Sequence, residues 1–310
     1  MSPHALKLIQ LRFFREVVDN DFNVSRAAAA LHTSQPGVSR HLQLLEQSLG
    51  VVLLNRQNTR IVGLTDAGAA LLPAVRQVLT EADNLQRQAR EIAAPAKTKF
   101  VIATTHTHAR HTLLPVLKTF MDTHPRIALQ LRQGSVPRIS QLLRDEIVDI
   151  GVSTDPVDHE GLALLPCYRY THSLITPPGH ALLKEKRITL ERLAQFPLIT
   201  YDERHRLGRL VREEFASSRL EPNIVMSIID DDIMKAYVEA GFGVAIMATM
   251  AFDPARDRGV RAIPLDHLFE PSTCYVMTKE RRYLERHIQD FIALVKSAQP
   301  GEAPARRGGR

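Results

Sequence analysis

The chain has 310 residues, of which 44% are hydrophobic and 24% are charged, and its formal net charge is +6. This length predicts two domains, or three if some are small, and the ordinary composition excludes wholesale disorder. The two cysteines form no CxxC pair, the N-terminal residues lack a secretory pattern, and no segment reaches the roughly 20 apolar residues of a membrane span, so we expect a cytoplasmic protein with no membrane segment.

Two short amphipathic helices are predicted near the N-terminus, because apolar residues recur at i, i+4 and i+7 over 24–31 and again over 38–45. The break between them is only a few residues long. Ser34 suits a helix N-cap, and Pro36 suits the first turn, where its missing N–H costs little. This pattern is typical of a helix-turn-helix, with an ordinary helical hairpin in a packed core as the alternative.

Polar side chains on the outer face of the second helix, and a predicted hairpin after it, suit DNA. The side chains on that face are Gln35, Ser39, Arg40, Gln43 and Gln47. They can hydrogen-bond base edges and phosphates. The run VVLLNRQNTRIVGL then predicts two short strands, with Arg56 and Arg60 beside the turn. Such a hairpin would be a wing that reaches the DNA backbone or minor groove.

A single long helix is predicted after the hairpin, with Thr65 as its N-cap. Its apolar stripe runs from Leu71 to Ile92, and we expect Pro73 to lie in the first turns. A helix of this length beside a small head is typical of one that pairs with a second copy of itself, because the stripe lacks adjacent partners. A strut packed on its own domain is the alternative.

Strands and helices alternate over residues 97–297. The predicted order begins with a strand over 99–104 and a helix over 109–122, and it ends with a helix over 283–297. Such alternation predicts mostly parallel sheets flanked by helices, and about 200 residues suffice for two such lobes. Residues 298–310 are poor in apolar side chains, so we expect a disordered tail.

The stretch NVSRAAAALHTSQPGVSRHLQLLEQSLGVVLLNRQNTRIVGLTDAG, residues 23–68, resembles the N-terminal domain of LysR-type transcriptional regulators. The resemblance extends over residues 5–297. Within that family the chain is similar to the CysB/Cbl-like subgroup, regulators of sulfur assimilation, through FREVVDNDFNVS, ATTHTHAR, LPCY, FPLITY and GFGVAIMATMAFDP. One departure is Leu54, where the family usually has Phe. We expect it to alter the packing of the wing and to leave the fold intact.

The resemblance implies an α/β fold class built from three parts. These are a winged helix-turn-helix DNA-binding domain over 1–63, a dimerising linker helix over 64–96 and a two-lobed, periplasmic-binding-protein-like effector domain over 97–297. The chain would cross twice between the lobes, which gives lobe one as 97–167 and 269–297, and lobe two as 168–268.

The resemblance also implies a transcriptional activator with no catalytic activity and no cofactor. Proteins of this family usually form homodimers that assemble into homotetramers. They bind dyad-symmetric double-stranded promoter DNA and respond to a small-molecule inducer or anti-inducer in the cleft, and contact with RNA polymerase belongs to that role. The family's DNA-contacting positions, together with the two wing arginines, give a candidate set of Ser34, Gln35, Pro36, Ser39, Arg40, Gln43, Arg56 and Arg60.

Hydroxyl-bearing residues follow several predicted strands, where an α/β lobe binds its ligands, often against a helix N-terminus. Few of these strand ends carry Lys or Arg, which favours a small anion or a polar neutral ligand. Helix capping alone is the alternative role for the Ser and Thr side chains. The candidate effector-binding residues are Thr105, Thr107, His108, Gln133, Ser135 and Thr154 in lobe one, and Thr200, Tyr201, Leu207 and Thr249 in lobe two.

The resemblance assigns a sulfur chemistry to this site. Thr105, Thr107 and Thr154 match the oxyanion-binding threonines of the subgroup, whose cleft takes sulfate and whose inducers are related to acylated serines. His108 stands where CysB has Gln, and Leu207 stands where it has a further Thr. His108 can donate a hydrogen bond or become a cation near its unperturbed pKa of about 6.5. Leu207 cannot hydrogen-bond, so we expect an oxyanion with an organic substituent, such as a sulfonate or adenylyl sulfate.

No metal or enzyme motif stands out. His106, His108 and His111 have no Cys or carboxylate in the same segment to complete a metal site. The acidic run 230–232 precedes a predicted helix and is expected to cap it. The sequence lacks a hydrolase elbow, a phosphate-binding loop and a dinucleotide fingerprint, so neither an enzyme nor a cofactor is expected.

Three alternatives to this function stay open. A two-lobed small-molecule-binding protein or enzyme has the same effector fold, and a coiled-coil adaptor has the same long helix. Within the family, a regulator of carboxylate or aromatic catabolism would bind its effector with more cations, and Arg110, Arg204 and Arg206 favour that reading. The helix-turn-helix, the long helix and the lack of an export signal argue against the first, and the α/β lobes argue against the second.

Overall fold

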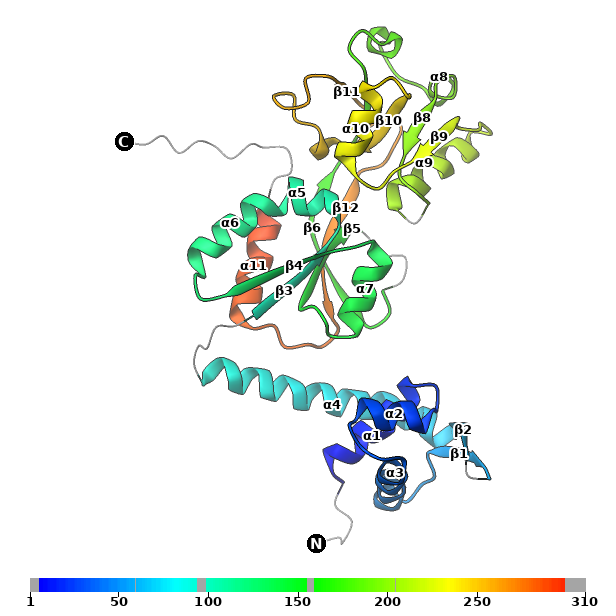
Figure 1. Ribbon diagram of the computed structural model, residues 1–310, viewed down its shortest axis with the longest axis vertical. Helices are drawn as coiled ribbons and strands as arrows, with labels where there is room; N and C mark the ends of the chain where they lie inside the picture. The colour runs from blue at the N-terminus through cyan, green and yellow to red at the C-terminus, as the bar shows by residue number, and fades with distance from the viewer. Residues whose placement is uncertain (1–5, 59, 94–98, 155–158, 204, 299–310) are drawn as a thin grey trace. The chain divides into compact units, whose positions relative to one another are not determined.

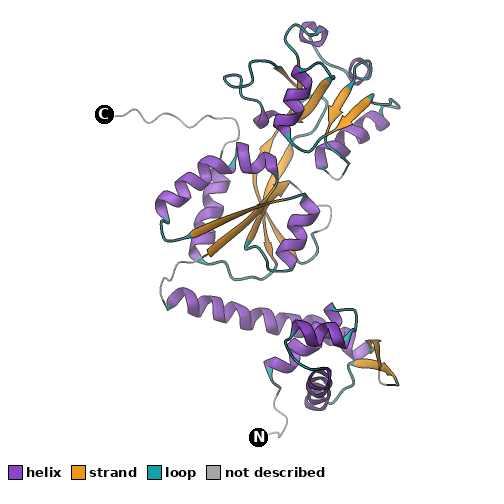
Figure 2. Cartoon of the chain, in the orientation of Figure 1, coloured by secondary structure: helices purple, strands orange, loops and turns teal. Residues whose placement is uncertain are grey.

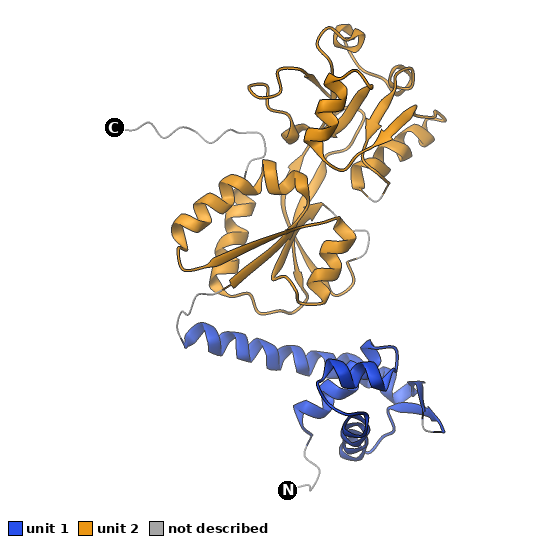
Figure 3. Ribbon diagram, in the orientation of Figure 1, with its two compact units in different colours: residues 1–94 blue, residues 95–310 orange. Residues whose placement is uncertain are grey.

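The computed structural model describes residues 6–58, 60–93, 99–154, 159–203 and 205–298 (Figure 1). They fall into two compact units, residues 1–94 and 95–310 (Figure 3). The first is helical apart from one small hairpin, whereas the second alternates helices with strands (Figure 2). The expected tail lies almost wholly outside the described residues. In the described part of the chain, no helix combines the length and the apolar character that crossing a bilayer requires.

The first unit is a winged helix-turn-helix followed by one long helix, as the sequence predicts. Its elements are α1 (Leu8–Asp19), α2 (Val24–Ala30), α3 (Gln35–Leu49), β1 (Leu54–Gln57), β2 (Arg60–Leu64) and α4 (Asp66–Ile92). The expected caps are confirmed: the Ser34 hydroxyl accepts the Gly37 N–H at 3.3 Å, and Thr65 accepts the Gly68 N–H at 3.0 Å. Gly50 ends α3 with φ of 73°, a left-handed conformation that glycine adopts without strain.

The long helix is part of the head and not a separate piece. Val75 and Leu79 of α4 are buried in one core with Phe14, Val38 and Leu42. The expectation that the stripe lacks adjacent partners is therefore wrong for its first half, and residues 1–63 and 64–96 do not form separate units. The cause is that α1 packs against α4 as well as against α2 and α3, so these helices share one core.

Pro73 is the eighth residue of α4, so the expectation that it lies in the first turns is also wrong. A proline at that depth removes the helical hydrogen bond to the carbonyl of residue 69 and costs about 3 kcal/mol. Burial of Val75 and Leu79 on the head offsets that cost. The Pro73 side chain faces solvent, where its ring displaces no core residue.

The second unit contains two five-stranded sheets, one in each lobe. The lobe-one sheet has the order β4-β3-β5-β12-β6 and the lobe-two sheet the order β11-β7-β10-β8-β9. The lobe-one strands are β3 (Lys99–Thr104), β4 (Ala128–Gln133), β5 (Ile150–Thr154), β6 (Leu162–Tyr170) and β12 (Ser272–Lys279). The lobe-two strands are β7 (His172–Thr176), β8 (Leu198–Thr200), β9 (Ile224–Ser227), β10 (Val244–Ala248) and β11 (Arg261–Pro264).

Short helices cover these sheets. In lobe one they are α5 (His106–His111), α6 (Leu113–Thr123), α7 (Val136–Arg144) and α11 (Arg286–Ser297). In lobe two they are η1 (Ala181–Lys184), α8 (Leu190–Leu193), α9 (Arg206–Ser217), α10 (Asp231–Glu239) and η2 (Thr249–Ala251). The single helix expected over 109–122 is broken at Thr112, whose hydroxyl turns to Met250 Sδ in lobe two at 3.4 Å. The break leaves α5 at the boundary between the lobes.

The sheets are mixed, whereas the sequence pattern predicted mostly parallel ones. β3 pairs in parallel with β4 and β5, but β12 pairs antiparallel with β5 and β6. The same division occurs in lobe two, where β7 runs antiparallel to both of its neighbours. The antiparallel strands β6, β7 and β12 adjoin the two crossings between the lobes, and β6 was missed at the sequence level.

The first crossing falls at Thr171, one residue beyond the expected stretch 167–170, so lobe one extends past the expected boundary between residues 167 and 168. Strand β6 stays in the lobe-one sheet through Tyr170, which pairs with Ser272 of β12, and β7 begins at His172 in the lobe-two sheet. Tyr170 therefore ends a lobe-one strand at the junction of the lobes, where its side chain can reach a site between them.

Candidate functional site

Helix α3 presents one polar face to solvent. Val38, Leu42 and Leu45 are buried on its other side, which fixes the orientation of the helix on the head. The exposed side chains include five of the predicted DNA-contacting residues: Gln35, Pro36, Ser39, Arg40 and Gln43. The Gln35 amide donates to the Ser25 hydroxyl at 2.9 Å, so it also ties α3 to α2.

The two wing arginines differ in their surroundings. Arg56 forms an ion pair with Glu46 of α3 at 2.9 Å, whereas Arg60 is exposed on β2. The Glu46 carboxylate also accepts the backbone N–H groups of Leu53 and Leu54, at 2.8 and 3.2 Å. Glu46 thus fixes the base of the wing against α3. Leu54, where the family usually has Phe, is buried in the core of the head.

A small pocket of about 10 Å³ lies between the two lobes of the second unit. Six of the predicted effector residues line it: Thr105, Thr107, His108, Thr154, Tyr201 and Leu207. Tyr170, His205 and Ala248 line it as well and were missed at the sequence level. No Lys or Arg belongs to this lining among the described residues. This volume is far below the roughly 300–1,000 Å³ typical of drug-sized ligands and has room for about one water-sized group, so the lobes of this structure are closed over the pocket.

His108 is a neutral side chain in this pocket. It is only 1% exposed, and its Nδ1 lies 2.9 Å from the Tyr168 hydroxyl. Burial, followed by the nearby His205 and His111, lowers the pKa of His108 to about 3. The expectation that it can become a cation near pH 6.5 is therefore wrong, because the interior disfavours the charged imidazolium. It takes part only as a neutral donor or acceptor.

Hydroxyl groups from lobe one meet on one side of the pocket. The Thr154 Oγ1 lies 2.8 Å from the Tyr170 hydroxyl and 3.5 Å from His108 Nε2. Burial raises the pKa of Tyr170 to about 12, so this hydroxyl keeps its proton. Thr105 is the N-cap residue of α5, and within the described residues its side chain makes no capping hydrogen bond. The Thr105 hydroxyl is therefore available to a ligand.

A buried carboxylate lies behind the opposite side of the pocket. Asp231 of α10 is 3% exposed and accepts hydrogen bonds from the hydroxyls of Thr107, at 2.6 Å, and Tyr201. Burial raises the pKa of Asp231, an effect that its two hydroxyl partners and Lys235 counteract. Asp230 caps α10 through the N–H groups of residues 232 and 233, as expected. The acidic run therefore has a second role beside the expected cap, because Asp231 joins lobe two to Thr107 of lobe one.

Four predicted effector residues lie outside the lining of this pocket. Gln133 and Ser135 are exposed at the end of β4 and the start of α7. Thr200 is buried in lobe two. Thr249 bonds to the hydroxyls of Thr171 and Ser173, at 3.1 and 2.8 Å, so it belongs to the crossing between the lobes. Their position after a strand correctly predicted that they lie near the edge of a sheet. It did not show which residues at that edge line the pocket.

The other candidate groups that the structure describes form no metal site and lie outside the pocket lining, apart from His108. Among the described residues, no group of three or more His, Cys, Asp or Glu side chains is arranged to hold a metal ion. Arg110 pairs with Asp232 at 2.6 Å, and Arg206 is not among the residues that line the pocket. Arg204 lies outside the described residues. Arg110 and Arg206 therefore do not belong to this lining.

Two family models match the chain. The model of the LysR substrate binding domain matches residues 93–300, and the model of the bacterial regulatory helix-turn-helix protein, lysR family, matches residues 8–69. The first of these models matches most of the second compact unit, and the other matches the helix-turn-helix and hairpin of the first.

Individual relatives match over nearly the whole chain. An HTH-type transcriptional regulator CysB of Burkholderia cenocepacia is 39% identical over 291 residues, which is 94% of this chain and 93% of that protein. An HTH-type transcriptional regulator SsuR of the same organism is 38% identical over 286 residues, 92% of this chain and 93% of that one. The crystal structure of the cofactor-binding domain of the Cbl transcriptional regulator aligns with a TM-score of 0.62 at 31% identity, covering 64% of this chain and 87% of that one.

Proposed function

The chain belongs to the LysR family of transcriptional regulators, and from that premise we propose that it controls sulfur-assimilation genes in response to a small sulfur oxyanion bound between its lobes. Sulfate, a sulfonate, adenylyl sulfate and an acylated serine are the candidate effectors. The observation that carries this proposal is the pocket, which offers hydroxyls and a neutral imidazole from both lobes and no lining cation among the described residues. The similarity to the CysB and SsuR regulators supports the same chemistry.

Neutral donors suit a tetrahedral sulfur oxyanion better than they suit a carboxylate effector. A sulfate or sulfonate spreads its charge over several oxygens that hydroxyls and backbone N–H groups can each bind. The pocket has room for about one water-sized group, so the anionic group enters only when the lobes move apart. An organic substituent beside Leu207 requires the lobes to move apart.

We expect Thr105→Val to weaken sulfate binding by about tenfold or more, since one hydrogen bond to a charged group contributes about 1.5–3 kcal/mol. Isothermal titration calorimetry of the full chain with sodium sulfate and with methanesulfonate measures this. Ser135→Ala is the matched control, because that hydroxyl lies outside the pocket lining, and its affinity should stay within twofold of wild type. Binding of benzoate or acetate in place of either sulfur anion would support the carboxylate alternative and contradict this proposal.

Binding to DNA is assigned to the exposed face of α3. We expect Arg40→Ala to reduce affinity for a specific promoter fragment by about 10–100-fold, because a bidentate contact to a base contributes about 1–3 kcal/mol. A gel shift with fragments selected by the full-length protein from genomic DNA measures it. Arg256→Ala, which removes an exposed arginine from the second unit, is expected to change affinity less than twofold. A protein that selects no fragment in a salt-sensitive manner is not a regulator of this kind.

The second half of α4 is proposed as the surface that joins two copies. Val78, Leu85 and Ile92 are spaced by seven residues and are 43%, 68% and 85% exposed. With Ala82 and Ala89 between them, they form the alternating three- and four-residue spacing of a coiled-coil seam. A homodimer joined in this way presents two copies of α3 to a dyad-symmetric site. Assembly of such dimers into a tetramer, and contact with RNA polymerase, belong to the same proposal.

A further inference from the structure

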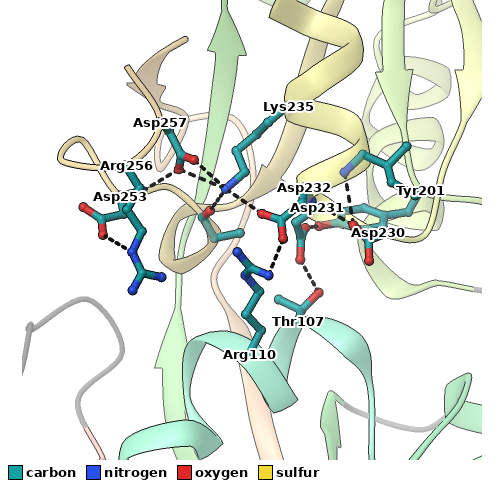
Figure 4. A network of polar contacts seen from close by, with 12 residues as sticks. Thr107, Arg110, Tyr201, Asp230, Asp231, Asp232, Lys235, Asp253, Arg256 and Asp257 are labelled. Carbon is teal, nitrogen blue, oxygen red and sulfur yellow. Dashed lines mark hydrogen bonds and ion pairs between the residues drawn. The ribbon is translucent and has the colours of Figure 1, made fainter. Parts of the chain in front are cut away.

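The lobes are joined beside the pocket by a group of polar contacts that the sequence did not predict (Figure 4). Thr107 comes from α5 of lobe one, and its hydroxyl donates to Asp231 Oδ2 of α10 in lobe two. Tyr201, which follows β8, donates its hydroxyl to the other carboxylate oxygen, Asp231 Oδ1. Thr107 and Tyr201 both line the pocket, whereas Asp231 lies behind them.

Each of these hydroxyls has a single proton to donate. While Asp231 is ionised it can only accept, so both protons point towards its carboxylate and away from the pocket. Thr107 and Tyr201 then face the pocket with oxygen lone pairs. A fully deprotonated oxyanion has no proton to offer those lone pairs and is repelled by them. It can bind these two side chains only if they turn their protons away from Asp231.

Ion pairs around the carboxylate strengthen the same junction. Arg110 of α5 pairs with Asp232 of α10 at 2.6 Å, so a second contact joins the two lobes. Lys235 is 8% exposed and lies 3.1 Å from Asp232 and 2.9 Å from Asp257. These cations compensate the acidic run and hold α10 in place, so the hydroxyl contacts to Asp231 form in a fixed geometry.

We propose that Asp231 is a built-in competitor for the effector, so that an oxyanion must take the Thr107 and Tyr201 hydroxyls from Asp231 and in doing so breaks a contact between the lobes. This inference rests on the proposed function of the pocket. It makes Asp231 a specificity-determining residue, because a ligand with donor groups of its own can bind without breaking the contact. It also gives the anion a direct means of changing the lobe arrangement, since a ligand shifts an equilibrium only through contacts that differ between the two states.

The test is the affinity of the full chain for sodium sulfate, measured by calorimetry. Asp231→Asn removes the charge with little change in shape and lets the side chain donate as well as accept. We expect it to bind sulfate at least tenfold more tightly than wild type. Asp253→Asn, which removes an acidic charge from the same lobe away from the pocket hydroxyls, should change affinity less than threefold. An equal gain in sulfate affinity in both variants would mean that the loss of one negative charge explains it, and this would overturn the inference.

A double variant separates competition from electrostatics. On a Thr107→Val background, Asp231→Asn should raise affinity less than it does in wild type, since only the Tyr201 hydroxyl then remains to be released. Thermal unfolding of each variant checks that it folds, and Asp231→Ser, with the same expected gain, replaces the asparagine variant if that one does not. Retention of the full gain on the valine background would overturn the competition.

Conformation supplies an independent readout. Sulfate should increase hydrogen–deuterium exchange in α5 and α10 of the wild-type chain and have little effect in the Asp231→Asn variant, where the contact is already weakened. If wild type and all variants bind no sulfate while DNA binding is intact, the proposal that Asp231 competes with the effector is refuted. The proposal that the chain is a DNA-binding regulator is then unaffected. Loss of specific DNA binding in wild type refutes the regulator, whatever the sulfate affinities are.

Discussion

Lowering the pH from 7 to 4 is expected to destabilise the second unit, and His108→Gln is expected to remove part of that loss. Burial lowers the pKa of His108 to about 3, while His111, His172 and His205 are lowered to about 4, again with burial as the main cause. In the unfolded chain these imidazoles titrate near their ordinary value of about 6.5. Between that value and the folded-state pKa, the unfolded chain therefore binds more protons than the folded one.

The sign follows from proton linkage. Stability rises with pH wherever the unfolded state holds more protons, so the contribution of each histidine is complete above pH 6.5 and is lost as the pH falls towards the folded-state pKa. For His108 the loss by pH 4 is about 3 kcal/mol, at 1.36 kcal/mol per pKa unit. Asp231 acts in the opposite direction, because burial raises its pKa and the folded chain then holds the extra proton. The quantity to measure is therefore the difference between wild type and the His108→Gln variant in how much unfolding free energy each loses as the pH falls.

Urea unfolding at pH 7, 5.5 and 4 measures this difference by circular dichroism and tyrosine fluorescence, since the chain has no tryptophan. The His108→Gln variant should lose about 3 kcal/mol less than wild type over that range, because glutamine keeps donor and acceptor groups without titrating. His106→Gln is the matched control: His106 is exposed on the same helix, and its curve should follow that of wild type. Identical pH dependence for the His108→Gln variant and wild type would contradict the buried, neutral state of His108.

The sequence predicted best the features that depend on neighbours in the chain. Ser34, Pro36 and Thr65 act on helix ends within a few residues of themselves, so the caps of α3 and α4 were predicted correctly. Thr105 and Thr154 were also placed in the pocket, because the carboxyl ends of adjacent parallel strands meet at one edge of a sheet.

The missed features depend on contacts between distant parts of the chain. Tyr170 reaches the pocket only because β6 pairs with β12, about a hundred residues later. Asp231 was interpreted as a cap, since nothing in its own segment indicates that Thr107, 124 residues away, lies against it. The neutral state of His108 follows from burial, which residue type and spacing do not specify. Tertiary packing therefore determined both the charge and the proton arrangement of the site.

Replacing Leu85 with Asp is expected to dissociate the protein into monomers and to reduce its affinity for a dyad-symmetric DNA site at least a hundredfold. Leu85 is 68% exposed in the single chain, so the substitution costs the folded monomer little. In a dimer joined along Val78, Leu85 and Ile92, it places two unpaired carboxylates in the seam, each costing several kcal/mol. Analytical ultracentrifugation and a gel shift on the same samples measure the two losses.

The loss of DNA affinity follows from the modest charge of a single head. Residues 1–65 contain seven Lys or Arg and four acidic residues, so one head has a weak electrostatic attraction for DNA and depends on the second copy. Leu85→Met should keep both dimer and DNA binding, because it preserves the apolar contact. Arg90→Asp introduces the same carboxylate about 140° around α4 from Leu85 and should leave the dimer intact. If the Leu85→Asp variant stays dimeric, or if Arg90→Asp dissociates the protein equally, the seam is not the contact between copies.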